Sequence, residues 1–138
     1  MKKLWGSRFQ EELAPEAKDF SFSLAVDREL LEAEIEVSRA HAKMLGKTRL
    51  ISAKEARTLI RGLEAVLKEL RSKCLRELCA EVEDVHTLIQ SVLEKKIGKT
   101  AKKLHTGRSR NDLVATSTRV WLKRKLNALI REIKSFQE

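Results

Sequence analysis

The chain has 138 residues, which is about one ordinary domain. Five glycines, one proline and 4% aromatic residues leave little material for a turn-rich β architecture, and a charged fraction of 36% is typical of long solvated helices. No apolar run approaches the roughly 18 residues that span a bilayer, and Cys74 and Cys79 form neither a disulfide framework nor a C-x-x-C site. We therefore expect an all-α, cytoplasmic protein without a membrane partner.

The first 26 residues lack sustained periodicity and are expected to form an irregular arm with one helical turn. Within this arm Phe20, Phe22 and Leu24 alternate with serines, and this period of two predicts an extended piece. Asp27 is a plausible N-cap, and Gly46 is well placed to end the helix that follows it.

Two further helices are expected between residues 52 and 98. Ser52-Ala53-Lys54-Glu55 has the pattern of a capping box, and the boundary between residues 71 and 82 stays open. The second of these helices begins near Asp84 and ends at Gly98, after which residues 99–108 are interpreted as a loop. The apolar stripe of the first helix consists of Ala56, Leu59, Ile60, Leu63, Val66, Leu67 and Leu70.

The last predicted helix runs from Ser109 to Glu138 without glycine, proline or a stop signal. A helix of this length spans roughly 45 Å, which is more than a domain of this size covers along one side. Its outer half must therefore pack on something else or fray. We expect self-association, or a companion polypeptide, through the apolar face that lies between Leu113 and Phe136.

The stretch L-H-T-G-R-S-R-N-D, residues 104–112, combines two arginines with a helix start. Unpaired backbone N–H groups and the helix dipole attract carboxylates or phosphates to such a start. Ser109 and Asp112 fit a capping pattern, Gly107 lets the backbone approach a ligand, and Asn111 can give and accept a hydrogen bond. Residues alone leave two readings open, an anion-binding site or a well-capped helix with solvated arginines.

The positive charge is concentrated around this stretch. Residues 95–125 hold eleven Lys and Arg and one acid, Asp112, which gives 11 − 1 = +10, whereas the whole chain carries +9. A basic tract can meet nucleic acid, an anionic membrane or a small acidic ligand. The segment lacks interleaved aromatic residues and any nucleic-acid-binding motif, so nucleic acid is the least favoured of these partners.

The nine residues Leu104–Asp112 resemble the signature of the argininosuccinate lyase family, within the fumarase/aspartase superfamily. Further matches follow the family's order along the chain. They are the opening L-W-G-S-R-F at residues 4–9, the serine segment F-S-L-A-V-D-R at 22–28, E-D-V-H-T at 83–87 and R-V-W at 119–121. The resemblance implies a small N-terminal helical domain, residues 1–108, followed by the first long helix of a central bundle, residues 109–138.

The family's reaction is a cofactor-free β-elimination that splits argininosuccinate into arginine and fumarate, in arginine biosynthesis. A base removes a proton beside a succinate carboxylate, and the resulting aci-carboxylate is stabilised by fixed donors. By resemblance, Ser23 and Asn111 would contact this anionic substrate, while Ser109 and Arg110 would line its carboxylate region. The same resemblance implies that Asp84, His86 and Thr106 border the site.

The histidines are otherwise interpreted as structural. His86 stands one turn into a helix, where a hydrogen-bonded structural role is more common than acid–base chemistry. His105 is interpreted as a residue that fixes its loop, and His41 as a surface residue. The resemblance adds no metal site.

Two family segments are not found in this sequence, a G-Y-T-H segment with the general acid and a G-S-S-x-M-P-x-K-K-N loop with the catalytic serine. No catalytic residue is therefore assigned, and the chain alone is expected to be inactive, as a shortened product or one part of a split enzyme. The family usually has N-D-Q-V-A-T-D where this chain has Leu113 and Ser117, and Ser7 replaces a glycine. The alternative is a non-catalytic helical interaction protein derived from the same fold.

Overall fold

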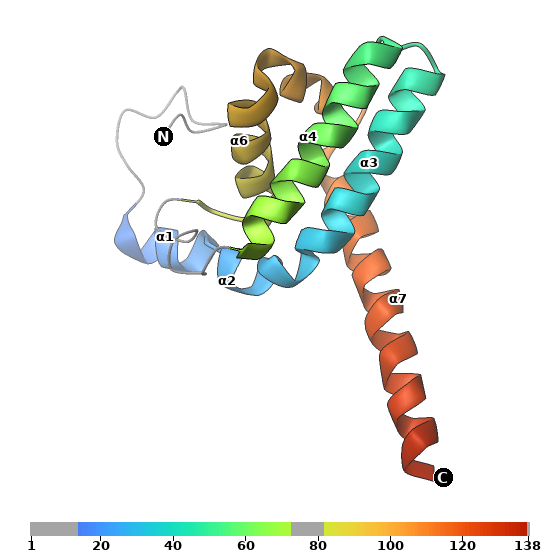
Figure 1. The fold of residues 1–138 in the computed structure, drawn as a ribbon. Helices are drawn as coiled ribbons and strands as arrows, with labels where there is room; N and C mark the ends of the chain where they lie inside the picture. The colour runs from blue at the N-terminus through green and yellow to red at the C-terminus, as the bar shows by residue number, and fades with distance from the viewer. Residues whose placement is uncertain (1–13, 73–81, 138) are drawn as a thin grey trace.

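A computed structural model of the chain describes residues 14–72 and 82–137, and no strand occurs within these ranges (Figure 1). The predicted all-α class is confirmed. The elements are α1 (Pro15–Ser21), α2 (Leu24–Asp27), the 3₁₀ turn η1 (Arg28–Leu30), α3 (Leu31–Lys47), α4 (Ala53–Ser72), α6 (Val85–Ile97), the 3₁₀ segment η2 (Gly98–His105) and α7 (Arg110–Gln137).

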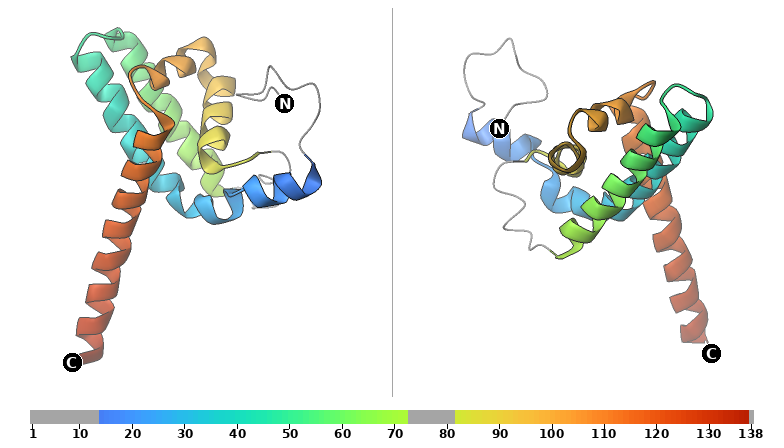
Figure 2. Two further views of the ribbon diagram at one scale, coloured as in Figure 1. Left: turned by 180° about the vertical axis from the view of Figure 1, so that it is seen from behind. Right: turned by 45° about the horizontal axis from the view of Figure 1, so that its top comes forward.

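The core lies between α3, α4 and α6. Helices α3 and α4 pack side by side, α6 and η2 pack on α4, and the first part of α7 packs on α3 (Figures 1 and 2). The predicted stripe of α4 faces this core, with Ile60 and Leu67 at its partly buried margins. Its fully buried members are Ala56, Leu59, Leu63, Val66 and Leu70. An amphipathic helix gains most of its stability from such burial.

The predicted capping box at the start of α4 is confirmed. The backbone N–H of Ser52 donates to Oε2 of Glu55 at 2.9 Å, and the N–H of Glu55 donates to the Ser52 hydroxyl at 3.2 Å. These two bonds satisfy donors that a helix start otherwise leaves unpaired. The Glu55 carboxylate also accepts from Nζ of Lys103 at 2.5 Å, and these contacts lower its pKa to about 2.

Both predicted ends of α6 are confirmed. Asp84 is extended and its carboxylate accepts the N–H of Thr87 at 2.7 Å, which is an N-cap bond. Gly98 follows the last residue with a φ of 61°, a left-handed conformation that glycine adopts without steric cost.

The expected start of the second helix is wrong. Asp27 is itself the last residue of α2, and helical backbone continues from it through η1 into α3. The N-cap is Ser23, whose N–H donates to the carbonyl of Glu83 at 2.9 Å. That contact spans 60 residues of sequence, so a local capping pattern could not have revealed it.

The extended piece predicted at residues 20–24 is also wrong. Phe20 lies in α1, and Phe22 alone among the apolar residues of that alternation has an extended backbone. The Phe20 side chain is 94% exposed, so it does not pin the segment. Helix α1 has seven residues, more than the single turn expected for the arm.

Gly46 does not end α3 as predicted, because the helix continues to Lys47. A Cβ atom at Gly46 would lie 2.7 Å from Cβ of Ala56, so the glycine allows close approach of α3 and α4. The left-handed residue after the helix is Arg49, with a φ of 61°. The glycine therefore serves packing between helices, and not chain reversal.

Most of the loop expected at residues 99–108 belongs instead to the 3₁₀ segment η2, Gly98–His105. Ala101 and Leu104 are both buried, and they stand three residues apart. A 3₁₀ helix has three residues per turn, so this spacing points both side chains to the core. The apolar pair was too short to be recognised as a periodic element.

Helix α7 confirms the predicted long final helix. Leu113 and Ser117, in its first two turns, are buried against the body. Its outer half leaves the body as a straight projection (Figures 1 and 2). An exposed apolar stripe, which we call the α7 seam, runs along this half and consists of Leu122, Leu126, Leu129, Ile133 and Phe136. The motif at residues 4–9 and the two cysteines lie outside the described residues.

Candidate functional site at the start of α7

The α7 start is built by a turn and a cap. Gly107 has a φ of 63°, the left-handed conformation that turns the chain into the helix. The N–H of Ser109 donates to Oδ2 of Asp112 at 3.0 Å, and the Ser109 hydroxyl accepts the N–H of Asn111 at 3.1 Å. The predicted capping role of Ser109 and Asp112 is therefore present in the structure.

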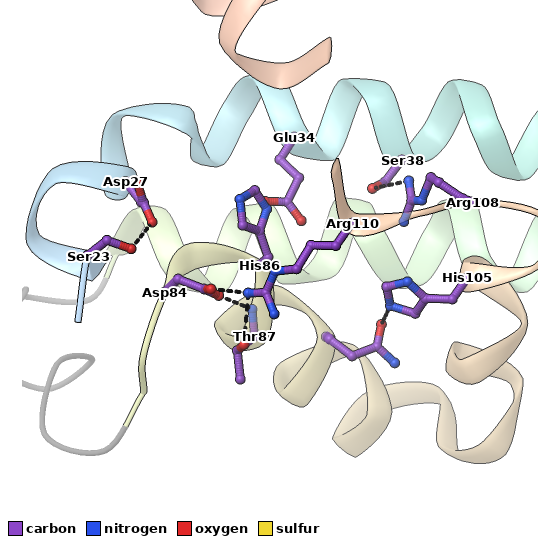
Figure 3. Close-up of polar contacts among 11 residues, drawn as sticks. Ser23, Asp27, Glu34, Ser38, Asp84, His86, Thr87, His105, Arg108 and Arg110 are labelled. Carbon is purple, nitrogen blue, oxygen red and sulfur yellow. Dashed lines mark hydrogen bonds and ion pairs between the residues drawn. The ribbon is translucent and has the colours of Figure 1, made fainter. Parts of the chain in front are cut away.

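Arg110, in the first turn of α7, connects this helix to the start of α6. Its Nη2 atom donates to Oδ2 of Asp84 and, at 3.2 Å, to the hydroxyl of Thr87 (Figure 3). Asp84 thus caps α6 with one oxygen and holds Arg110 with the other. Two helix N-termini that are far apart in sequence are fixed beside each other by one carboxylate.

His86 lies behind this pair, against Glu34 of α3 (Figure 3). Nδ1 of His86 and Oε2 of Glu34 are 2.5 Å apart, and both side chains are buried. Burial alone would lower the pKa of His86, but the contact with Glu34 and the charge of Asp84 outweigh it, so the pKa is raised. A raised pKa favours the imidazolium, which is the form in which His86 pairs with the Glu34 carboxylate.

Three contacts hold the loop that precedes α7. Nη1 of Arg108 donates to the Ser38 hydroxyl at 3.2 Å, and Nε2 of His41 lies 3.0 Å from the carbonyl of Thr106. His105 Nε2 lies 3.1 Å from Oε1 of Gln90, as its predicted loop-fixing role requires. His41 is intermediate in exposure, so it is a surface residue that also contacts the loop.

The electrostatics of this loop are set by burial and by the arginines. Burial lowers the pKa of Arg108, and the carboxylates of Glu34 and Asp112 act against that effect. Burial and the charge of Arg108 also lower the pKa of His41 and of His105. Both imidazoles are thereby biased toward the neutral form at a place where positive charge is already concentrated.

The residues expected at the site fall into three places. Asp84, His86 and Arg110 form one cluster, with Ser109 and Asn111 exposed beside it on the same helix start. Ser23 stands next to this cluster, because its N–H bonds to Glu83, but its hydroxyl donates to Asp27. Thr106 is exposed on the other side of the turn and meets His41 through its carbonyl.

Sequence reasoning missed Glu34, Ser38 and Thr87 as members of this cluster. Glu34, Ser38 and His41 stand at i, i+4 and i+7, a spacing that places them on one face of a helix. That shared face was the available signal. The sequence did not reveal what this face contacts, because the partners of these residues lie about 50 to 70 positions away.

Carboxylates from the rest of the molecule partly offset the charge of the basic segment. Among residues 14–72 and 82–137, five of its eleven cations form ion pairs, and every acid involved lies outside residues 95–125. The pairs are Lys96–Glu69, Lys103–Glu55, Arg110–Asp84, Arg124–Glu36 and Lys125–Glu29. The concentration of positive charge along the chain is therefore much weaker in the folded molecule.

Among residues 14–72 and 82–137, no group of three or more His, Cys, Asp or Glu side chains is arranged to hold a metal ion. Within the same ranges, no helix is long and apolar enough to cross a membrane. The chemistry that the α7 start offers is that of polar donors, which are the exposed Asn111 amide and the arginine forks.

A family model described as lyase matches residues 7–138. The chain therefore belongs to this lyase family, whose fold is the all-α fumarase/aspartase fold. Within the family it is similar to argininosuccinate lyases, as the sequence motifs indicated. It is 45% identical over 133 residues to that of Desulforudis audaxviator, 43% over 129 residues to that of Prochlorococcus marinus and 40% over 136 residues to that of Clostridium kluyveri.

These alignments cover 94% to 99% of the chain but only 28% to 31% of the relatives. The chain thus spans about 30% of the length of the curated relatives that it matches.

Proposed function

We propose that this chain provides the substrate-carboxylate part of an argininosuccinate lyase, the enzyme of arginine biosynthesis that releases arginine and fumarate by β-elimination. The observation that carries the proposal is the joined start of α6 and α7, where Asp84 holds Arg110 beside Ser109 and Asn111. The similarity to argininosuccinate lyases along nearly the whole chain supports the same activity.

The chemistry of the reaction suits such a site. When a proton leaves the carbon next to a carboxylate, negative charge develops on the carboxylate oxygens. Preorganised donors at a helix N-terminus stabilise that charge most in the transition state. We assign Ser109 and Arg110 to the carboxylate region, and Ser23 and Asn111 to direct substrate contact, with Asp84, His86 and Thr106 around them.

A calorimetric titration with fumarate tests the binding part of this proposal. Asn111→Ala should weaken fumarate binding, because it removes an amide that we assign to substrate contact. The fold should stay intact, because the Asn111 side chain is exposed and makes no hydrogen bond within the described structure. Asn127→Ala is the matched control, since it removes an exposed amide from the same helix at a distance from the site. Equal fumarate affinity of the two variants would contradict the assignment.

The 138-residue polypeptide should bind substrate without converting it. Asp84 and Arg110 hold each other, and His86 is buried against Glu34, so we assign none of these groups as the acid or base. The expected result is no arginine or fumarate above a blank when the pure chain is incubated with argininosuccinate. Turnover by the chain alone would contradict this part.

We propose further that the α7 seam packs against α7 of other copies of the chain. Successive seam residues are separated by four, three, four and three positions, which is the spacing of a coiled-coil seam. Its side chains are largely exposed on the projecting half of the helix. Burying apolar surface lowers the free energy by about 25 cal/mol per Å², so association through the seam is favoured.

A further inference from the structure

A polar stripe on α3 faces the proposed site. It consists of Glu34, Ser38 and His41, of which Glu34 is 2% exposed and Ser38 is 1% exposed. Burying a carboxylate and a hydroxyl is costly unless each finds a partner. Figure 3 shows Glu34 and Ser38 on α3, directed toward His86 and Arg108 respectively.

Each member of the stripe contacts a different part of the site. Glu34 meets His86 of α6 at 2.5 Å, Ser38 accepts from Arg108 at 3.2 Å, and His41 lies 3.0 Å from the Thr106 carbonyl. One helix face thus contacts both the first turn of α6 and the turn that leads into α7. Those are the two segments that Asp84 and Arg110 join.

Glu34 is the charged member of the stripe, and its charge acts on both segments. It raises the pKa of His86 against the effect of burial, and it opposes the lowering of the Arg108 pKa by burial. The other charged groups that act on His86 are Asp84, which favours the imidazolium, and Arg110, which disfavours it. Glu34 is therefore a common counter-charge for a histidine and an arginine that come from different elements.

We propose that Glu34 is a positioning residue for the carboxylate site: it fixes His86 at the first turn of α6 and, together with Ser38, seats Arg108 at the entry to α7. The inference rests on the proposed function, because the site that Glu34 positions is the one assigned above to the substrate carboxylate. Glu34 itself is covered by protein. Its effect passes through His86 and Arg108.

Packing alone does not account for a carboxylate at this position. Replacing a buried ion pair by apolar residues of similar volume is often neutral or stabilising, whereas removing one partner is strongly destabilising. What a charge pair adds is a defined geometry between the groups it joins. That geometry matters here because the donors at the α7 start must be aligned with the oxygens of a carboxylate.

Glu34→Gln tests the proposal, with Glu32→Gln as the matched control. Both changes remove one negative charge from α3, but Glu32 pairs with Arg71 on the exposed side of the molecule. The pKa of His86, followed by the NMR signals of its ring, should fall in Glu34→Gln and stay raised in Glu32→Gln. Fumarate binding by calorimetry should weaken in Glu34→Gln on the order of tenfold, by analogy with metal sites, where loss of a residue that orients the ligating groups costs roughly 10–100-fold in affinity.

Glu34→Asp keeps the charge on a shorter side chain and covers the case in which the glutamine variant does not fold. His86 should keep a raised pKa in this variant, and fumarate binding should be weaker than in the unchanged chain. An unchanged His86 pKa in a folded Glu34→Gln chain, or full fumarate affinity in either Glu34 variant, would overturn the positioning role. If the unchanged chain does not bind fumarate, the proposed function fails, and the His86 titration still decides whether Glu34 holds the imidazolium.

Discussion

At the scale of single residues, the buried serines Ser38 of α3 and Ser117 of α7 differ in whether their hydroxyl groups have a hydrogen-bond partner. Ser38 and Ser117 are both at most 1% exposed. The Ser38 hydroxyl accepts a hydrogen bond from Arg108, whereas the Ser117 hydroxyl has no hydrogen-bond partner in the described part of the chain. A buried hydroxyl without a partner keeps its desolvation penalty and gains nothing in return.

Ser117→Ala should therefore raise the free energy of unfolding by about 1 kcal/mol, because it removes an unsatisfied buried hydroxyl. Ser38→Ala should lower it by about the same amount, because Arg108 loses its acceptor. Urea denaturation of both variants beside the unchanged chain measures the difference. Equal destabilisation by the two changes would show that packing of the hydroxyl, and not its hydrogen bonding, determines the result.

His105 predicts a pH dependence of stability. Its folded-state pKa is lowered from 6.5 by burial, Arg108, Arg110 and His41, with Glu94 acting in the opposite direction. Below pH 6.5 the unfolded chain therefore binds a proton that the folded chain resists, and stability falls with pH until the folded-state pKa is passed. The raised pKa of His86 works in the opposite sense, since its contribution is fully present below 6.5 and is lost as pH rises.

His105→Gln should remove the first of these effects and keep a polar group near Gln90. The stability of the variant relative to the unchanged chain should increase steadily as pH falls from about 7 to 5. Urea denaturation at several pH values provides the measurement. A difference between the two chains that is independent of pH would contradict the lowered pKa of His105.

Local chemistry largely determined which helix ends could be predicted from sequence. The Ser52–Glu55 box, the Asp84 cap and Gly98 are short-range signals, and the structure confirms each of them. The start of α2 is different, because the N–H of Ser23 is satisfied by Glu83, far along the chain. The 3₁₀ segment η2 is different again, since its two buried residues form too short a pattern to be distinguished from a loop.

The same distinction applies to the candidate site. The start of α7 could be predicted from the sequence, because the turn at Gly107 and the cap formed by Ser109 and Asp112 lie within five positions of one another. Glu34 could not be assigned, because its partner His86 lies 52 positions later and only tertiary packing brings them together. Whether Ser23, Ser109, Arg110 and Asn111 bind substrate stays a prediction.

The contact between α3 and α4 predicts a coupled pair of substitutions. Gly46→Ala should lower the free energy of unfolding by about 1–3 kcal/mol, because its Cβ would lie 2.7 Å from Cβ of Ala56 and the helices must separate. Adding Ala56→Gly should relieve that clash, so the double variant should be more stable than the sum of the two single effects. Urea denaturation of all four chains measures the coupling, and strict additivity would contradict it.

At the scale of the whole molecule, the ion pairs of the basic segment lie on the body and the middle of α7, whereas the exposed apolar seam lies on the outer half of α7. Within the described residues, five of the eleven cations of the basic segment pair with acids of the body, and Lys125 and Arg124 attach the middle of α7 to Glu29 and Glu36. Beyond these pairs α7 has no comparable attachment in the described structure, and its apolar seam is exposed. The outer half of α7 therefore leaves a continuous apolar surface without a packing partner in the described structure.

Adding two charges to the seam should prevent self-association. The double variant Leu126→Lys and Ile133→Lys should sediment as a monomer at concentrations where the unchanged chain forms oligomers, because the seam is no longer apolar. Asn127→Lys with Ser135→Lys adds the same charge on the other side of the helix and should leave association unchanged. Sedimentation velocity over a range of concentrations makes the comparison. A monomeric unchanged chain at every concentration would contradict the seam's role.

The uninterrupted length of α7 has a mechanical consequence. Its 28 residues extend for about 42 Å, and no glycine or proline divides them. Such a helix moves as one rigid rod, with Arg110 at the end packed on the body and Phe136 at the projecting end. A tilt of about 5° at the first turn moves the far end by about 4 Å, given that rise per residue. Any assembly that clamps the far end therefore also sets the angle at which Arg110 meets Asp84.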